Sequence, residues 1–255
     1  MKTNTLGFWT LTKKEINRYL KVITQTVTSP VISNLLFLAV FGLSLNKSMP
    51  EVNGISYLGF LAPGLIAMGM MNNAFQNPSS SIMISKYNHT IYDLLVLPLT
   101  PLQIELAYII SAMTRGLMVG AATLVTMIIF TSIPFLNIPL IIVGAIIINT
   151  IFALLGIVIG IWSKEFDNLA AIQSFIITPL IYLGGVFYAL DVLPALFQKI
   201  SAFNPFAYMI DLFRAGFTNQ PHFPIWLSLT VCGATILVLH CFIHWALKTG
   251  WKIKQ

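Results

Sequence analysis

The sequence predicts an all-α integral membrane protein with six transmembrane helices. Of its 255 residues, 57% are hydrophobic and only 9% are charged, whereas soluble domains carry about 25% charged residues. The apolar residues gather into long stretches separated by short polar segments, and about 20 apolar residues are enough for a helix to cross a bilayer. The basic residues lie at the ends of these stretches rather than in one patch, so the net charge of +6 does not indicate a nucleic-acid-binding protein.

Ahead of the first apolar stretch, residues 7–21 mix aromatic, aliphatic and basic side chains over one helix length. This composition is typical of an amphipathic helix that lies in the lipid headgroup plane. Pro30 stands near the start of the first span, where a helix tolerates the missing amide donor. The six predicted spans are residues 27–45, 55–75, 111–133, 140–162, 169–188 and 224–247.

A cluster of amide side chains lies at the end of the second predicted span, and its members are Asn72, Asn73, Gln76 and Asn77. Pro78 follows, and we expect it to stop the helix. The amides then have two possible roles: they satisfy the carbonyl groups of a hydrated helix end, or they line a polar path through the protein. On the second interpretation, Gln173 and Thr178 of the fifth predicted span are further path-lining candidates.

Residues 79–112 form the longest segment without a clear span. Within it, apolar residues of 86–97 recur at helical spacing and predict a short amphipathic helix, which Pro98 and Pro101 are expected to end. Such a helix either presents its face to a groove on a partner protein or lies on the membrane without a partner. Arg115 follows about one turn inside the third predicted span, where a long side chain can reach the membrane interface.

After the fifth predicted span come two short apolar pieces, 190–200 and 205–217, separated at Asn204-Pro205. Each has roughly 11 to 13 residues, which is too short to span and typical of re-entrant or interfacial helices. Non-helical backbone at membrane depth is tolerated only where protein buries it or where it lines a cavity. We therefore predict two re-entrant half-helices over 190–217 that contribute to a lined path.

Ionisable side chains in the apolar stretches offer few candidates for chemistry. His240 and His244 lie four residues apart, a spacing that can bind a metal, but their span contains no acidic residue, so packing histidines are expected. Asp211 and Arg214 lie three residues apart and can pair on one helix. The sequence contains no G-x-x-x-x-G-K-[ST] phosphate loop, so this motif for binding ATP is absent from it.

Six spans place both termini on the same side of the membrane. Eleven of the 14 Lys and Arg residues lie in the termini and loops of that side, and three lie on the other. Lys and Arg are concentrated on the cytoplasmic side of membrane proteins. Both termini are therefore predicted to be cytoplasmic.

A series of Pro, Gly, Asn and aromatic positions runs in order through the later part of the chain. Its members are Thr178-Pro179, Gly184-Gly185-Val186-Phe187-Tyr188, Leu193-Pro194, Asn204-Pro205, Tyr208-Met209 and Arg214. The series resembles the signature of type-2 ABC transporter permeases, the membrane subunits of two-part exporters for drugs, lipids and polysaccharides. A looser resemblance extends over the whole chain.

The resemblance implies a permease of the bacterial inner membrane that forms the substrate path as a homodimer. A separate ABC ATPase would bind ATP and magnesium, and no enzymatic activity or bound cofactor is expected on this chain. Segment 86–97 would be the coupling helix that docks on the ATPase, through Ile91, Tyr92, Asp93, Leu94, Leu95 and Leu97. The outer gate would lie in the re-entrant region, with Gly184, Gly185, Tyr188, Asn204, Pro205, Asp211 and Arg214.

Two other classes of function make different demands on the sequence. A self-sufficient secondary transporter or channel would place ionisable residues near mid-span for ion coupling. None of the eight acidic residues stands clearly at the centre of a predicted span. An intramembrane enzyme would need a nucleophile or metal constellation, for which His240 and His244 are the sole candidates.

Overall fold

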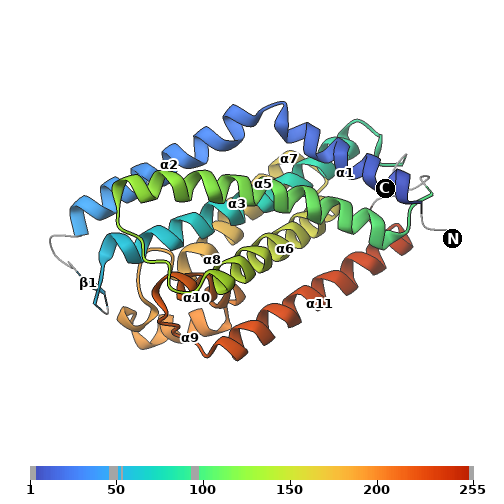
Figure 1. The fold of residues 1–255 in the computed structure, drawn as a ribbon. Helices are drawn as coiled ribbons and strands as arrows, with labels where there is room; N and C mark the ends of the chain where they lie inside the picture. Colours follow the sequence, from blue (N-terminus) through green and yellow to red (C-terminus); the bar gives the residue numbers. More distant parts are fainter. Residues whose placement is uncertain (1–3, 46–50, 53, 93–97, 253–255) are drawn as a thin grey trace.

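A computed structural model describes residues 4–45, 51–52, 54–92 and 98–252, and these residues are almost entirely helical (Figure 1). The long helices are α1 (Thr5–Leu20), α2 (Ile23–Leu45), α3 (Tyr57–Tyr87), α5 (Pro101–Phe130), α6 (Ile138–Trp162) and α11 (Ile225–Thr249). Between α6 and α11 lie α7 (Phe166–Ile172), the π-helical turn η1 (Gln173–Ile177), α8 (Thr178–Leu183), the 3-10 turn η2 (Leu190–Val192), α9 (Ala195–Phe203) and α10 (Pro205–Thr218). An antiparallel hairpin of β1 (Glu51–Val52) and β2 (Ile55–Ser56) precedes α3 and pairs Glu51 with Ser56 and Val52 with Ile55.

Six helical segments of the described residues are long and apolar enough to cross a membrane. They are α2, α3, α5, α6, the continuous helix of α7, η1 and α8, and α11. The predicted all-α membrane fold with six spans is therefore confirmed. The headgroup position of α1 and the re-entry of α9 and α10 into the membrane stay predictions.

Helix α3 forms the centre of the bundle. Its side chains are buried along nearly the whole helix, and it packs against α2, α5, α6 and α10. Figure 1 shows the long helices running side by side, with α1 beginning and α11 ending at one end of the bundle and the β-hairpin lying toward the other. The position of α3 means that its polar side chains face protein or a cavity rather than lipid.

The prediction that Pro78 stops the second span was wrong, because α3 continues to Tyr87. Proline removes an amide donor and crowds the preceding turn, and two hydroxyl groups supply side-chain donors to this part of α3. Ser79 Oγ donates to the carbonyl of Phe75 at 2.8 Å, and Ser80 Oγ donates to that of Gln76 at 2.6 Å. The burial of α3 among its neighbours adds packing that local helix propensity does not include.

The third span also begins earlier than predicted, at Pro101 rather than at residue 111. Pro101 was expected to end the preceding helix, but it occupies the first turn of α5, where proline is favoured. A capping box fixes this start: Thr100 Oγ1 accepts from the Gln103 amide at 3.2 Å, and Gln103 Oε1 accepts from the Thr100 amide at 3.0 Å. Residues 86 and 87 of the predicted coupling helix belong to the end of α3, and 93–97 lie outside the described residues.

The fifth span was predicted as 169–188, but its helix covers 166–183 and contains the π-helical turn η1. A proline ring clashes with the carbonyl four residues earlier in a regular helix, and the wide turn ends at Ile177, two residues before Pro179. The Thr178 amide and hydroxyl both donate to the Gln173 carbonyl, the hydroxyl at 2.8 Å. The helix ends at Gly184, and Gly185 has a φ of +84° that favours glycine.

The close packing of α3 against α6 can be tested directly. A Cβ added at Gly156 of α6 would lie 2.4 Å from the Phe75 carbonyl oxygen and 2.7 Å from Pro78 Cγ. We expect Gly156→Ala to lower the midpoint of thermal unfolding in detergent by several degrees, since overpacking costs about 1–3 kcal/mol. Gly233→Ala is the matched control, because nothing lies within 4 Å of its added Cβ. Equal midpoints for the two variants would contradict the close approach.

Candidate functional site

A cavity of about 830 Å³ opens between α2, α3, α5 and the helix of α7, η1 and α8. Most of its lining side chains are polar, although all of these segments qualify as membrane spans. From α2 the polar lining residues are Gln25, Thr26, Ser29, Ser33 and Asn34; from α3 they are Asn72, Asn73, Gln76, Ser79 and Ser80; and Arg115, Gln173, Thr178 and Tyr182 complete the set. Burying amides and hydroxyls without partners is costly, so this surface is suited to water or to a polar ligand.

The structure brings together the five residues that the sequence offered as path-lining candidates. Asn72, Asn73, Gln76, Gln173 and Thr178 all line this cavity. The first three lie in the middle of α3 rather than at its end, so the alternative of a hydrated helix terminus does not hold. The amide nitrogens of Asn72 and Asn73 donate to the carbonyls of Met68 and Gly69 at 3.1 and 3.0 Å. Asn72 Oδ1 is left as an acceptor, whereas Asn73 Oδ1 accepts from Arg115 Nε.

Arg115 is a cavity residue that the sequence analysis missed. It was placed one turn inside a span starting at 111, but α5 starts at Pro101 and carries Arg115 near its middle. Its Nε donates to Asn73 Oδ1 at 3.2 Å, and its side chain lines the cavity. The capping signal at Thr100 and Gln103 was the pattern that could have revealed the earlier start.

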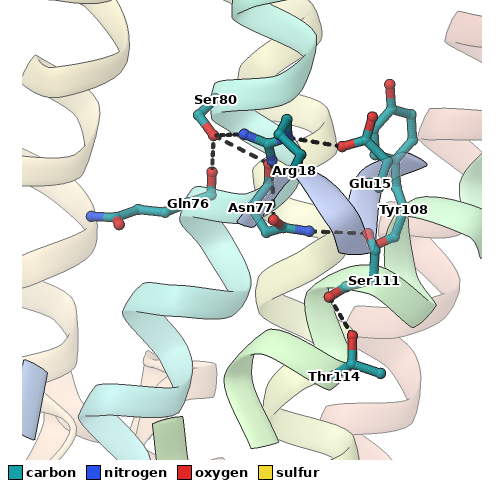
Figure 2. Close-up of polar contacts among 8 residues, drawn as sticks. All are labelled: Glu15, Arg18, Gln76, Asn77, Ser80, Tyr108, Ser111 and Thr114. Carbon is teal, nitrogen blue, oxygen red and sulfur yellow. Dashed lines mark hydrogen bonds and ion pairs between the residues drawn. The ribbon is translucent and has the colours of Figure 1, made fainter. Parts of the chain in front are cut away.

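A network of polar contacts joins α1, α3 and α5 (Figure 2). Arg18 donates to Ser80 Oγ at 3.1 Å, to Asn77 Oδ1 at 3.0 Å and to the Asn77 carbonyl. Arg18 also pairs with the fully buried carboxylate of Glu15, at 3.1 Å. Asn77 Nδ2 continues the network by donating to Ser111 Oγ at 3.0 Å. Because Ser80 lines the cavity, the network ties α1 to the cavity wall.

Several of the predicted gate residues meet at the turn that follows α8. Arg214 of α10 is buried and donates through Nη2 to the carbonyls of Gly185 and Val186, at 2.7 and 3.2 Å. Its guanidinium lies 3.9 Å from the ring centre of Phe60 in α3. Asn204 caps α10 by accepting from the Phe206 amide at 3.0 Å. These contacts fix the 184–188 turn against α3 and α10.

The remaining gate residues also make contacts that hold backbone. Asn204 Nδ2 donates to the Leu180 carbonyl at 2.7 Å, and Pro205 occupies the first turn of α10. The Tyr188 hydroxyl donates to the Tyr182 carbonyl at 3.0 Å. These bonds bring the start of α10 and the residues after α8 onto the end of α8.

The expected direct pair of Asp211 and Arg214 is replaced by separate backbone contacts. Asp211 accepts from the amides of His222 and Phe223 at 3.0 and 2.9 Å, while Arg214 donates to carbonyls of the 184–188 turn. Burial raises the pKa of Asp211 above its ordinary value, and the two amides and Arg214 act in the opposite direction. Asp211 thus anchors the loop that leads into α11.

His240 makes a polar contact that its sequence neighbours did not reveal. Its Nδ1 lies 2.8 Å from Oε1 of Glu105, a buried carboxylate of α5. His244 lies one turn along, with its ring centre 6.2 Å from that of His240. Within the described ranges, no group of three or more His, Cys, Asp or Glu residues is arranged to hold a metal ion.

Of the predicted docking residues, the structure describes Ile91 and Tyr92. Ile91 is buried, and Tyr92 is 43% exposed. Asp93, Leu94, Leu95 and Leu97 lie outside the described residues. The docking role of this segment stays a prediction.

Most of the chain is similar in sequence to known proteins. Residues 7–218, which run from α1 to the end of α10, match the family described as ABC-2 type transporter. The chain is 36% identical over 236 residues to the inner membrane transport permease YadH of Escherichia coli (strain K12), covering 92% of this chain and 91% of that protein. It is 26% identical over 236 residues to nodulation protein J of Rhizobium leguminosarum bv. viciae, covering 92% of this chain and 90% of that protein.

Proposed function

The chain belongs to the ABC-2 type transporter family, and from this premise we propose that it is the permease subunit of a two-component ABC exporter. Two copies form the substrate path, and separate subunits bind ATP and magnesium and supply the hydrolysis. The membrane is the inner membrane of a bacterium, as in the name of the Escherichia coli relative. Both termini face the cytoplasm, as the distribution of Lys and Arg favours.

The observation that carries this proposal is the polar cavity among membrane helices. Apolar helices that serve only as an anchor have no need for amides and hydroxyls in their contacts, because unsatisfied polar groups are unfavourable in hydrocarbon. A cavity lined by such groups supports passage of a polar cargo. The resemblance to permeases and the cavity therefore support the same class of function.

The surface beside the cavity supports pairing of two copies. On α2, Ile32, Leu36 and Val40 are more than half exposed, and Phe175 of η1 is 81% exposed. These residues belong to the two segments that flank the cavity. A second copy placed against them would cover apolar surface and close the cavity into a shared path.

In the proposed mechanism, one part of the chain receives the movement of the ATPase and another part forms the outer gate. ATP binding closes the ATPase dimer, and movement passes to the permease through the segment around Ile91 and Tyr92. The turn at 184–188, fixed by Arg214, forms the outer gate together with α9 and α10. A cargo or a nucleotide changes the balance of inward-facing and outward-facing states only if it binds them unequally.

Purification with the ATPase encoded beside the gene tests the proposal. We expect a stable complex in detergent whose vanadate-sensitive ATP hydrolysis changes when the permease is present. Transport by the purified permease alone, without any ATPase, would contradict the proposal and favour a self-sufficient transporter.

The contact of Glu105 with His240 is the specific observation that favours this alternative, a secondary transporter or channel. A buried carboxylate in a membrane helix is a candidate for proton coupling. For an ATP-driven permease, we expect Glu105→Gln to keep transport dependent on ATP and insensitive to a proton gradient, as in the unchanged protein. The measurement is uptake into inverted vesicles with and without an uncoupler. If the uncoupler abolishes uptake by the unchanged protein and Glu105→Gln removes that effect, the secondary transporter is the correct assignment.

A further inference from the structure

The cavity carries an unbalanced positive charge. Among the described residues that line it, Arg115 is the one charged side chain, and no carboxylate faces it there. Arg115 Nε is bonded to Asn73 Oδ1 at 3.2 Å, while its two terminal nitrogens have no partner in the described part of the chain. A guanidinium presents a fork of donors that suits carboxylate and phosphate groups. The two terminal nitrogens of Arg115 are therefore available to bind an anion in the cavity.

The rest of the lining offers both donors and acceptors. Several side chains of the lining have no hydrogen-bond partner within the described residues, namely Gln25, Ser29, Ser33, Gln76 and Gln173. Asn34 donates to the Leu65 carbonyl at 3.2 Å, so its amide oxygen is also left as an acceptor. Amides and hydroxyls can both donate and accept, which fits a ligand with several hydroxyl groups.

We propose that this cavity binds an anionic, hydroxyl-rich group of the cargo, a sugar that carries a phosphate or carboxylate, and that Arg115 contacts its anion. This proposal rests on the proposed function at one point, the identification of the bound group as part of the transported cargo. The binding site itself does not depend on an ATPase. The volume of about 830 Å³ lies within the range of about 300–1,000 Å³ for small-molecule sites. A neutral or cationic cargo group would leave the Arg115 fork unpaired.

The charge of the cavity can be measured without knowing the cargo. Ser33 is an exposed lining residue of α2, and Ser33→Cys is made with Cys241→Ser, since Cys241 is exposed and Cys232 is buried. The probes are two thiol reagents of similar size and opposite charge, sulfonatoethyl and trimethylammonioethyl methanethiosulfonate. We expect the ratio of anionic to cationic labelling rates to exceed that of an exposed control, Thr5→Cys, by about tenfold, as a nearby unit charge predicts.

Two variants connect this ratio to Arg115. Arg115→Gln removes the charge, and Asn73→Asp neutralises it through the acceptor that Arg115 Nε already uses. Both are expected to return the labelling ratio to that of Thr5→Cys, whereas Arg115→Lys should preserve it. Thermal unfolding in detergent identifies any variant that fails to fold, and Asn73→Asp then decides the result. A ratio unchanged by neutralisation would overturn the proposal.

Protection from labelling tests the chemical class of the ligand. The probes are glucose 6-phosphate, glucose and inorganic phosphate, added to purified Ser33→Cys permease without any ATPase. We expect glucose 6-phosphate to slow labelling most, and Arg115→Gln to remove its advantage over glucose. Equal protection by glucose would exclude an anion requirement, and equal protection by inorganic phosphate would exclude a role for the hydroxyl groups. Because no ATPase is present, a failed complex in the purification experiment leaves this result valid.

Discussion

Arg214→Met is expected to lower the thermal unfolding midpoint of the purified protein by about 10 °C and to abolish transport. Hydrogen bonds to a charged group contribute about 1.5–3 kcal/mol each, and Arg214 makes two of them, to the carbonyls of Gly185 and Val186. A loss of 1 kcal/mol shifts the midpoint by about 2–4 °C in a protein of this size. Transport is lost as well because the 184–188 turn is no longer fixed to α10.

The structure explains why no neighbour can replace Arg214. The side chain is buried, and it lies over the ring of Phe60. A Cβ on Gly64 would come within 2.4 Å of the Val186 carbonyl oxygen and 2.9 Å of Arg214 Nη2. The turn, α3 and α10 are therefore too closely packed for water to take over both carbonyls.

Two variants serve as controls for this prediction. Arg214→Lys keeps the charge but lacks the planar guanidinium that lies over the Phe60 ring, so an intermediate midpoint is expected. Lys199→Met removes a cation from the exposed surface of α9 and should leave the midpoint within about 1 °C, as surface substitutions usually do. A midpoint for Arg214→Met equal to that of Lys199→Met would show that the turn is held by other contacts.

The second large effect is expected for Arg18→Met. Glu15 is fully buried, and Arg18 is the ion-pair partner of its carboxylate. Removing one partner of a fully buried pair costs about 3–5 kcal/mol, because the other charge is left uncompensated. Because Arg18 is itself 28% exposed, a cost near the lower end of this range is expected. The same change releases the contacts of Arg18 with Asn77 and Ser80 of α3. We expect a fall in the unfolding midpoint of about 10 °C, measured by the same thermal assay.

A double substitution separates the buried charge from the other contacts of Arg18. Glu15→Gln combined with Arg18→Met removes both charges, so it should recover a large part of the stability that Arg18→Met loses. Lys14→Met is the control on the same helix, at an exposed position. If the double variant is less stable than Arg18→Met alone, the carboxylate is not the source of the loss.

The sequence was sufficient to predict the six spans, because hydrophobicity over about 20 residues reports directly on membrane crossing. It also selected four amides of the cavity, Asn72, Asn73, Gln76 and Gln173, since an amide in an apolar stretch is unusual wherever the helix ends, but it did not single out Gln25 and Asn34 of α2. Helix ends were less well predicted. Pro78 and Pro101 have the same local effect on the chain, but one lies inside α3 and the other starts α5. Burial of α3 and the cap at Thr100 decide between these outcomes.

The contacts of charged side chains were the part that sequence spacing could not supply. Asp211 and Arg214 are neighbours on one helix, yet each is used by a different loop. Glu105 and His240 are 135 positions apart and nevertheless meet. Such pairings depend on how α5, α10 and α11 are arranged, which periodicity within a single helix does not determine.

The π-helical turn η1 is a position where the chain can change in length by one residue. A π-helical turn accommodates one residue more than a regular helix needs over the same distance. Phe175 and Ile176 lie in that turn with exposed side chains, whereas Gln173 and Thr178 at its borders face the cavity. A chain lacking one of the two exposed residues could therefore close into a regular helix without changing which residues stand in the wall. Deletion of a single residue should be accepted here more readily than in α3, whose side chains are buried along nearly the whole helix.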